Sequence, residues 1–147
     1  MIEIEEARAL PEGLDQLVAV SEAEGFHMLE RLERRWRSGE NRFDGPGEGL
    51  FAAREAGRLL GVAGVCRDPY LGDPRVGRVR HVYVDPAARR HGVGGALVRA
   101  AMARAASVFG RLRLRTDTEE GNRFYRVLGF GPSQEDGATH VLEGASP

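Results

Sequence analysis

The sequence contains one cysteine, one tryptophan and no lysine, since all 21 of its basic residues are arginine. The lone Cys66 excludes an internal disulfide and cannot build a zinc site by itself. A Walker A phosphate loop requires a lysine, so that class of nucleotide site is excluded as well. No apolar run approaches the roughly 20 residues that a membrane-spanning helix needs. We therefore expect neither a metal site nor a membrane partner.

The start of the chain is acidic and lacks the basic and apolar stretches of a secretory signal. With 41% hydrophobic and 29% charged residues, the composition is that of a soluble globular protein, and we expect a cytoplasmic location. A length of 147 residues suits one domain, predicted over residues 1–147. Arginine in the place of lysine suggests a bacterial genome rich in G and C.

Charge is distributed unevenly along the chain. The net charge is −1, yet between residues 78 and 115 the charged residues are arginines with Asp85 as the one acidic residue. Such a segment either forms solvated faces or creates a positive field around a polyanionic ligand. A nucleic-acid partner is not expected, because the whole chain is slightly acidic and no aromatic repeat lies among the arginines.

Residues 79–97 form the most informative segment. An apolar, β-rich run meets Asp85-Pro86, and a basic glycine loop then leads into an Ala/Leu-rich helix. The first turn of a helix has unbonded backbone N–H groups and the positive end of the helix dipole, which together favour a phosphate. A plain turn between strand and helix would need the glycines too, so the glycines alone do not distinguish a phosphate site from an ordinary turn.

The spacing of Arg89-x-x-Gly92-x-Gly94 resembles the R/Q-x-x-G-x-G/A signature of the GNAT superfamily of N-acetyltransferases. Further along, the stretch from Phe124-Tyr125 to Phe130 resembles the family's FY-x-x-L-G-F segment. The two segments occur in the family's order, and the resemblance covers roughly residues 50–131. The dinucleotide fingerprint is a poorer match, because it belongs directly after a first strand.

Hydrophobic periodicity predicts alternating strands and helices. The expected strands cover residues 2–7, 50–54, 59–66, 78–84, 111–116 and 139–142, with a further short strand at Phe130. Two helices are expected within residues 11–38, one over 92–109 and one over 119–128. The resemblance implies an α/β, GNAT-type three-layer fold, with a central mixed sheet of six to seven strands, helices on both faces and a splay between two parallel strands.

The resemblance also implies acetyl-CoA as the acetyl donor and Tyr125 as the acid that protonates its sulfur. The family often has an asparagine seven residues before this tyrosine and an alanine four before, where Thr118 and Gly121 stand here, so Asn122 and Thr118 itself are the candidate replacements. The residues expected to hold the cofactor are Val82, Tyr83, Val84, Arg89, Arg90, His91, Gly92, Val93, Gly94, Gly95 and Asn122.

The general base and the acceptor site are less determined. Candidates for the base are His81, Asp68 and a water chain. Regular strand alternation would turn His81 away from the face that Arg78, Arg80, Val82 and Val84 share, unless a β-bulge shifts the register. On that face Arg78 and Arg80 could bind an acidic acceptor or pair with protein carboxylates. Asp68 and Trp36 are further candidates for the acceptor site.

The resemblance implies acetyl transfer from a thioester to a primary amine of a small molecule by direct attack. No covalent enzyme intermediate is required for that reaction, so the lack of a Ser/His/Asp arrangement is no objection. Protein or peptide N-acetylation is the near alternative, and a catalytically idle acyl-CoA-binding module is the alternative of another class. A homodimer is compatible with each of them.

Overall fold

The computed structural model describes residues 1–144. A seven-stranded sheet in the order β1-β2-β3-β4-β5-β7-β6 forms the centre. Its strands are β1 (Glu3–Glu6), β2 (Gly49–Glu55), β3 (Arg58–Arg67), β4 (Val76–Val84), β5 (Arg111–Leu114), β6 (Gly131–Pro132) and β7 (His140–Glu143). The helices are α1 (Leu14–Ala23), α2 (Met28–Ser38), α3 (Val93–Ala105) and α4 (Glu119–Val127), with a 3₁₀ turn over Pro86–Ala88. The predicted elements and their order are confirmed, with ends that differ by a few residues.

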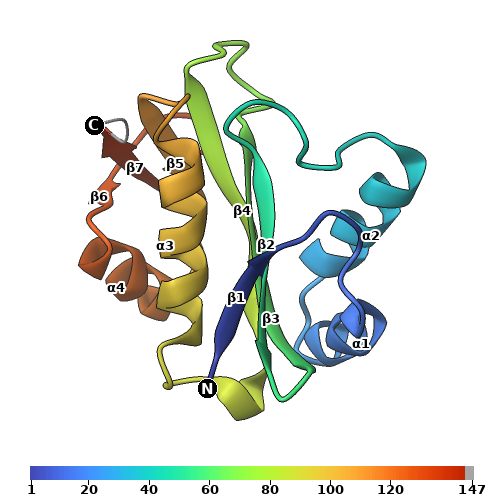
Figure 1. Cartoon of the computed structure of the whole chain (residues 1–147). Helices are drawn as coiled ribbons and strands as arrows, with labels where there is room; N and C mark the ends of the chain where they lie inside the picture. Colours follow the sequence, from blue (N-terminus) through green and yellow to red (C-terminus); the bar gives the residue numbers. More distant parts are fainter. Residues whose placement is uncertain (145–147) are drawn as a thin grey trace.

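Helices cover both faces of the sheet, as Figure 1 shows. The pair α1 and α2 lies on one face, and α3 and α4 lie on the other. Helix α3 buries Val93, Leu97, Ala101 and Ala105, whose spacing of four places them on one stripe against the sheet. Each face therefore has its own apolar core, and the sheet is buried between them.

Strand β4 belongs to the one parallel pair among the described strands. It pairs with β5 only from Val76 to Arg78, opposite Arg111 to Arg113. β5 ends at Leu114, whereas β4 continues to Val84 and remains paired with β3 on its other edge. The two parallel strands therefore separate beyond Arg78, which is the splay that the resemblance implied.

A β-bulge interrupts β4 within this unpaired stretch. Between Arg80 and Tyr83 two residues of β4 face one residue of β3, and His81 adopts a positive φ of 60°. An extra residue reverses the alternation that follows it. The expectation that Arg80, Val82 and Val84 share a face is therefore wrong: the two valines pack with the α3 core, as Val79 does, whereas Tyr83 packs in the α1–α2 core.

Candidate functional site

Beyond β4, the chain passes through the 3₁₀ turn and enters α3 by way of residues 89–92. Asp85 begins the turn, and its carboxylate accepts a hydrogen bond from the backbone N–H of Ala87 at 2.9 Å. No backbone N–H from Arg90 to Gly95 donates to an acceptor within residues 1–144, and the first helical bond runs from Ala96 to Gly92 at 3.1 Å. The loop therefore presents consecutive donors together with the positive end of the α3 dipole.

Two glycines shape this loop in different ways. Gly92 caps α3 in the left-handed region at φ 79°, where a side chain would be strained. Gly94 has an ordinary helical conformation, and a Cβ there would lie 3.4 Å from the Phe124 ring and 3.6 Å from Val84. A side chain at position 94 would therefore lie against Phe124 and Val84, beside the free backbone donors at the start of α3.

Arg89 is bound within the protein. Its guanidinium pairs with Glu24 at the end of α1, with N–O distances of 2.6 and 3.0 Å, and its Nε donates to the carbonyl of Val84 at 3.1 Å. The Tyr83 hydroxyl donates to the same carboxylate, and the Arg89 guanidinium lies 5.4 Å from the Tyr83 ring. The hydrogen bonds from Arg89 and then Tyr83 lower the pKa of Glu24. Arg89 and Tyr83 thus connect the glycine loop to α1, and the remaining loop side chains, Arg90 and His91, are exposed.

Tyr125 lies in α4 behind the glycine loop. Its side chain is only 8% exposed and packs edge-on against Phe124 and Phe130, with ring centroids 4.8 and 5.7 Å away. Burial alone raises the pKa of Tyr125 above its ordinary value. The hydroxyl therefore keeps its proton at neutral pH, as a proton donor must.

Asn122, one turn before Tyr125, is already hydrogen-bonded. Its Oδ1 accepts from Nε2 of His140 at 2.8 Å, and its Nδ2 donates to Glu119 at 3.2 Å. The other ring nitrogen of His140 lies 2.9 Å from the Thr139 hydroxyl, and burial lowers the pKa of His140. Sequence reasoning missed His140, whose ring lies 6.3 Å from that of Tyr125. Contact with a cofactor remains a prediction for Asn122.

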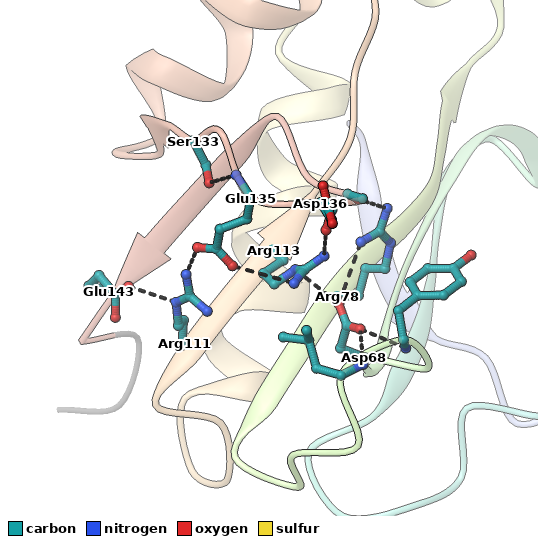
Figure 2. Close-up of polar contacts among 11 residues, drawn as sticks. Asp68, Arg78, Arg111, Arg113, Ser133, Glu135, Asp136 and Glu143 are labelled. Carbon is teal, nitrogen blue, oxygen red and sulfur yellow. Dashed lines mark hydrogen bonds and ion pairs between the residues drawn. The ribbon is translucent and has the colours of Figure 1, made fainter.

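A buried ion network lies at the opposite end of β4 from the glycine loop (Figure 2). Asp68 Oδ2 lies 3.4 Å from Nη1 of Arg78 and 3.3 Å from Nε of Arg113. Asp68 Oδ1 accepts from the backbone N–H groups of Tyr70 and Leu71. Arg78 also donates to the carbonyl of Gly137 at 2.7 Å, so the network connects the β3–β4 loop to the β6–β7 turn.

This network bears on two residues proposed for the acceptor site, and for Arg78 it favours the alternative of a protein carboxylate. Arg78 has a carboxylate partner inside the protein, so it lacks the unpaired guanidinium that an acidic acceptor would need. Both oxygens of Asp68 already accept from donors, and its side chain is fully buried, so no oxygen is available to remove a proton. Trp36 stacks on Phe43 and lines a cavity of about 310 Å³, which Arg80 does not line.

The bulge places His81 on the α2 face. Its side chain is 7% exposed, its ring lies 5.9 Å from that of Phe43, and its Nδ1 is buried without a hydrogen-bond partner within residues 1–144. Burial, followed by the charges of Arg80, Arg35 and Arg31, lowers the pKa of His81 to about 3. The imidazole is therefore neutral at pH 7 and is a weak base, which makes it a poor candidate for removing a proton from an ammonium.

His81 also has a consequence for stability in acid. The unfolded chain binds a proton at His81 below about pH 6.5, whereas the folded chain does so only near pH 3. The free energy of unfolding should therefore decrease as the pH is lowered through this window, by up to about 1.4 kcal/mol per pH unit. We expect His81→Asn, which tolerates the left-handed backbone, to reduce that slope. Urea unfolding at pH 7, 5.5 and 4.5 measures it, and an unchanged slope in the variant would contradict the assignment.

Within residues 1–144 no helix is long and apolar enough to cross a membrane. In the same part of the chain no group of three potential metal-ligating side chains occurs.

Comparison with known proteins places the chain in a family. A model of the acetyltransferase (GNAT) family matches residues 13–130. A structure from Exiguobacterium sp. 255-15, assigned as an acetyltransferase, is 34% identical with a TM-score of 0.86, covering 97% of this chain and 93% of that one. An acetyltransferase from Streptococcus agalactiae 2603 is 21% identical with a TM-score of 0.73 over 95% of both chains. A transcriptional regulator from Bacillus halodurans C-125, 24% identical with a TM-score of 0.70 over 95% of this chain and 99% of that one, shares the fold. The search of curated proteins gave no match.

Proposed function

This chain belongs to the GNAT family of acetyltransferases, and we propose that it moves an acetyl group from acetyl-CoA to a primary amine of a small molecule by direct transfer. The observation that carries the proposal is the run of backbone N–H groups from Arg90 to Gly95 that have no acceptor in the described chain. These donors begin a helix at the end of the strand whose edge becomes free beyond Arg78.

The residues present fit coenzyme A. Its pyrophosphate would accept hydrogen bonds from the N–H groups between Arg90 and Gly95, with the side chains of Arg90 and His91 beside it. The backbone of Val82 and Val84 lies in the part of β4 that has no β5 partner, and this edge can pair with the amide groups of the pantetheine arm. Arg89 acts by holding the loop to Glu24 rather than by reaching a phosphate itself.

Acetyl-CoA, when bound, supplies the acetyl group as a thioester. We assign to Tyr125 the transfer of its hydroxyl proton to the sulfur that departs as a thiolate. The acceptor nitrogen forms its bond to the acetyl carbon as the carbon–sulfur bond breaks. The excess proton on nitrogen passes to water, and the Tyr125 phenolate regains a proton from water. We choose water because Asp68 has no free oxygen and burial makes His81 a weak base.

The first test concerns the glycine loop. Gly94→Val is expected to raise the Kd for acetyl-CoA at least about a hundredfold, because the loss of two charge-assisted hydrogen bonds at about 1.5 kcal/mol each has that effect. The fold should survive, since the first added carbon meets its neighbours at ordinary distances. Isothermal titration calorimetry measures the Kd.

A matched control is Gly110→Val, where a Cβ would meet nothing within 4 Å and the backbone is not left-handed. This variant should bind acetyl-CoA as the parent does. Unchanged affinity in a folded Gly94→Val protein would remove the loop from the binding site.

A second assay separates the function classes. Thiol release from acetyl-CoA is measured with a panel of small amines and with peptides that have free N-termini or lysines. Turnover with small amines supports the proposal, and turnover with peptides alone would replace it by peptide acetylation. Binding of acetyl-CoA without turnover on any acceptor would favour the idle module.

A further inference from the structure

Two arginines of β4, separated by one residue, differ in their surroundings. Arg78 is buried and matched by Asp68, by the carbonyl of Gly137 and by the ring of Tyr70, which lies 4.9 Å from its guanidinium. Arg80 is partly buried, yet no carboxylate of residues 1–144 lies within ion-pair distance of it. A guanidinium withdrawn from water without an anion is unfavourable, so an unpaired one of this kind suits a ligand that brings its own negative charge.

Arg80 lines a cavity of about 430 Å³ on the α2 face of the sheet. Cys66 of β3 and Arg35 of α2 lie in its wall together with Asn41 and Asp44 of the α2–β2 loop. Burial raises the pKa of Cys66, while the adjacent Arg80 and Asn41 side chains act in the opposite direction. The volume lies in the range of sites for small molecules, and it would hold an amine the size of an amino acid rather than a folded protein segment.

The carboxylates of this cavity are mostly engaged elsewhere. Glu48 accepts from the backbone N–H groups of Gly45 and Arg67 at 2.9 and 2.8 Å. Glu40 pairs with Arg35 at 3.0 Å. Asp44 is exposed to solvent and forms no ion pair within residues 1–144. Glu48 and Glu40 are thus engaged by other donors, and no carboxylate of the described residues pairs with Arg80, which leaves it available to an anion.

We propose that the acceptor amine carries a carboxylate or phosphate, and that Arg80 binds this acidic group in the cavity. This inference rests on the proposed acetyl transfer, since it specifies the acceptor of that reaction. Arg80 directly precedes the bulge and lies in the stretch of β4 beyond Arg78 whose edge has no β5 partner. One small molecule can therefore place its acidic group at Arg80 and extend its amine toward the edge where the pantetheine arm is expected.

The experiment compares amines in matched pairs by thiol release from acetyl-CoA. One pair is an amino acid and its carboxamide, and the other is a phosphorylated amino alcohol and the parent amino alcohol. We expect the acidic member of at least one pair to have the higher kcat/KM. Arg80→Gln should lower kcat/KM for that acidic amine by at least about thirtyfold, largely through KM. The kcat/KM of Arg80→Lys should lie between those of the parent and Arg80→Gln, because lysine keeps the positive charge and loses the planar guanidinium.

The control is Arg34→Gln, which removes an exposed arginine of α2 that lies outside the cavity. It should leave kcat/KM for the acidic acceptor within about twofold, which corresponds to the small value of an exposed ion pair. Acetyl-CoA affinity should be unchanged in every Arg80 variant, and circular dichroism melting confirms that each variant is folded.

Calorimetric titration of the same amines onto the protein, with coenzyme A present, tests the cavity independently of turnover. Binding of an acidic amine that is lost in Arg80→Gln supports the inference even if no thiol is released, in which case the proposed transfer alone fails. Equal binding and turnover of both members of each pair, preference for polycationic amines, or no effect of Arg80→Gln overturns the inference. Equal turnover of both members would leave the proposed transfer intact.

Discussion

Replacing Asp68 with asparagine is expected to lower the free energy of unfolding by about 3–5 kcal/mol, because it leaves the buried Arg78 without its carboxylate and Arg113 with Glu135 alone. The side chain of Asp68 is fully buried, and those of Arg78 and Arg113 are 9% and 1% exposed. Asparagine keeps the shape and can still accept from Tyr70 and Leu71. Its amide, however, has a donor where Oδ2 now faces both arginines. Urea unfolding at pH 7 measures the loss.

The matched control is Asp117→Asn at an ion pair of the same kind on the surface. Asp117 lies 3.3 Å from Arg115, and the two side chains are 74% and 60% exposed. Exposed pairs contribute about 0–1 kcal/mol, so the control should unfold nearly as the parent does. A loss at Asp68 no larger than the control's would show that water or the β6–β7 turn compensates the arginines, and the network would not be a stabilising element.

The glycine loop could be predicted from the sequence because its determinants are local. Asp85-Pro86 ends a strand, Gly92 supplies the left-handed cap of α3, and the apolar stripe of α3 follows at helical spacing. Each of these preferences acts within a few residues, so the order strand, loop and helix can be recognised without knowledge of tertiary contacts. The alternating strands around this segment were predictable for the same reason.

The sequence is compatible with a β-bulge at His81 but does not predict one. Its presence depends on which residue of β3 lies opposite each residue of β4, and residues 78–84 read as a regular strand in the sequence. One additional residue reverses the faces that follow it, so the prediction that Val82 and Val84 share a face with Arg80 was wrong although the strand itself was right. The partners of charged side chains were equally hidden. Glu24 reaches Arg89 across 65 positions, and no local pattern marks that pair.

Tyr125→Phe is expected to lower kcat by about 10²–10⁴-fold, the range over which a positioned general acid contributes. The ring should stay in place, because its contacts are with Phe124 and Phe130, and burial is the one cause that raises the pKa of its hydroxyl. Acetyl-CoA affinity and stability should therefore change little, so that kcat and kcat/KM fall together. Steady-state thiol release on an acceptor established with the parent protein measures both constants.

The control for this substitution is Tyr70→Phe, which removes the hydroxyl of a 64% exposed tyrosine in the β3–β4 loop. Its turnover should match that of the parent, since its ring packs on Arg78 and its hydroxyl is not assigned a role.

The pH profile gives a second readout. Burial raises the pKa of Tyr125 above its ordinary value of about 10, so the acid stays protonated and activity should not fall on the alkaline side up to about pH 9. Parent-like turnover in Tyr125→Phe would assign the proton on sulfur to water, and Tyr125 would then be a packing residue beneath the cofactor loop.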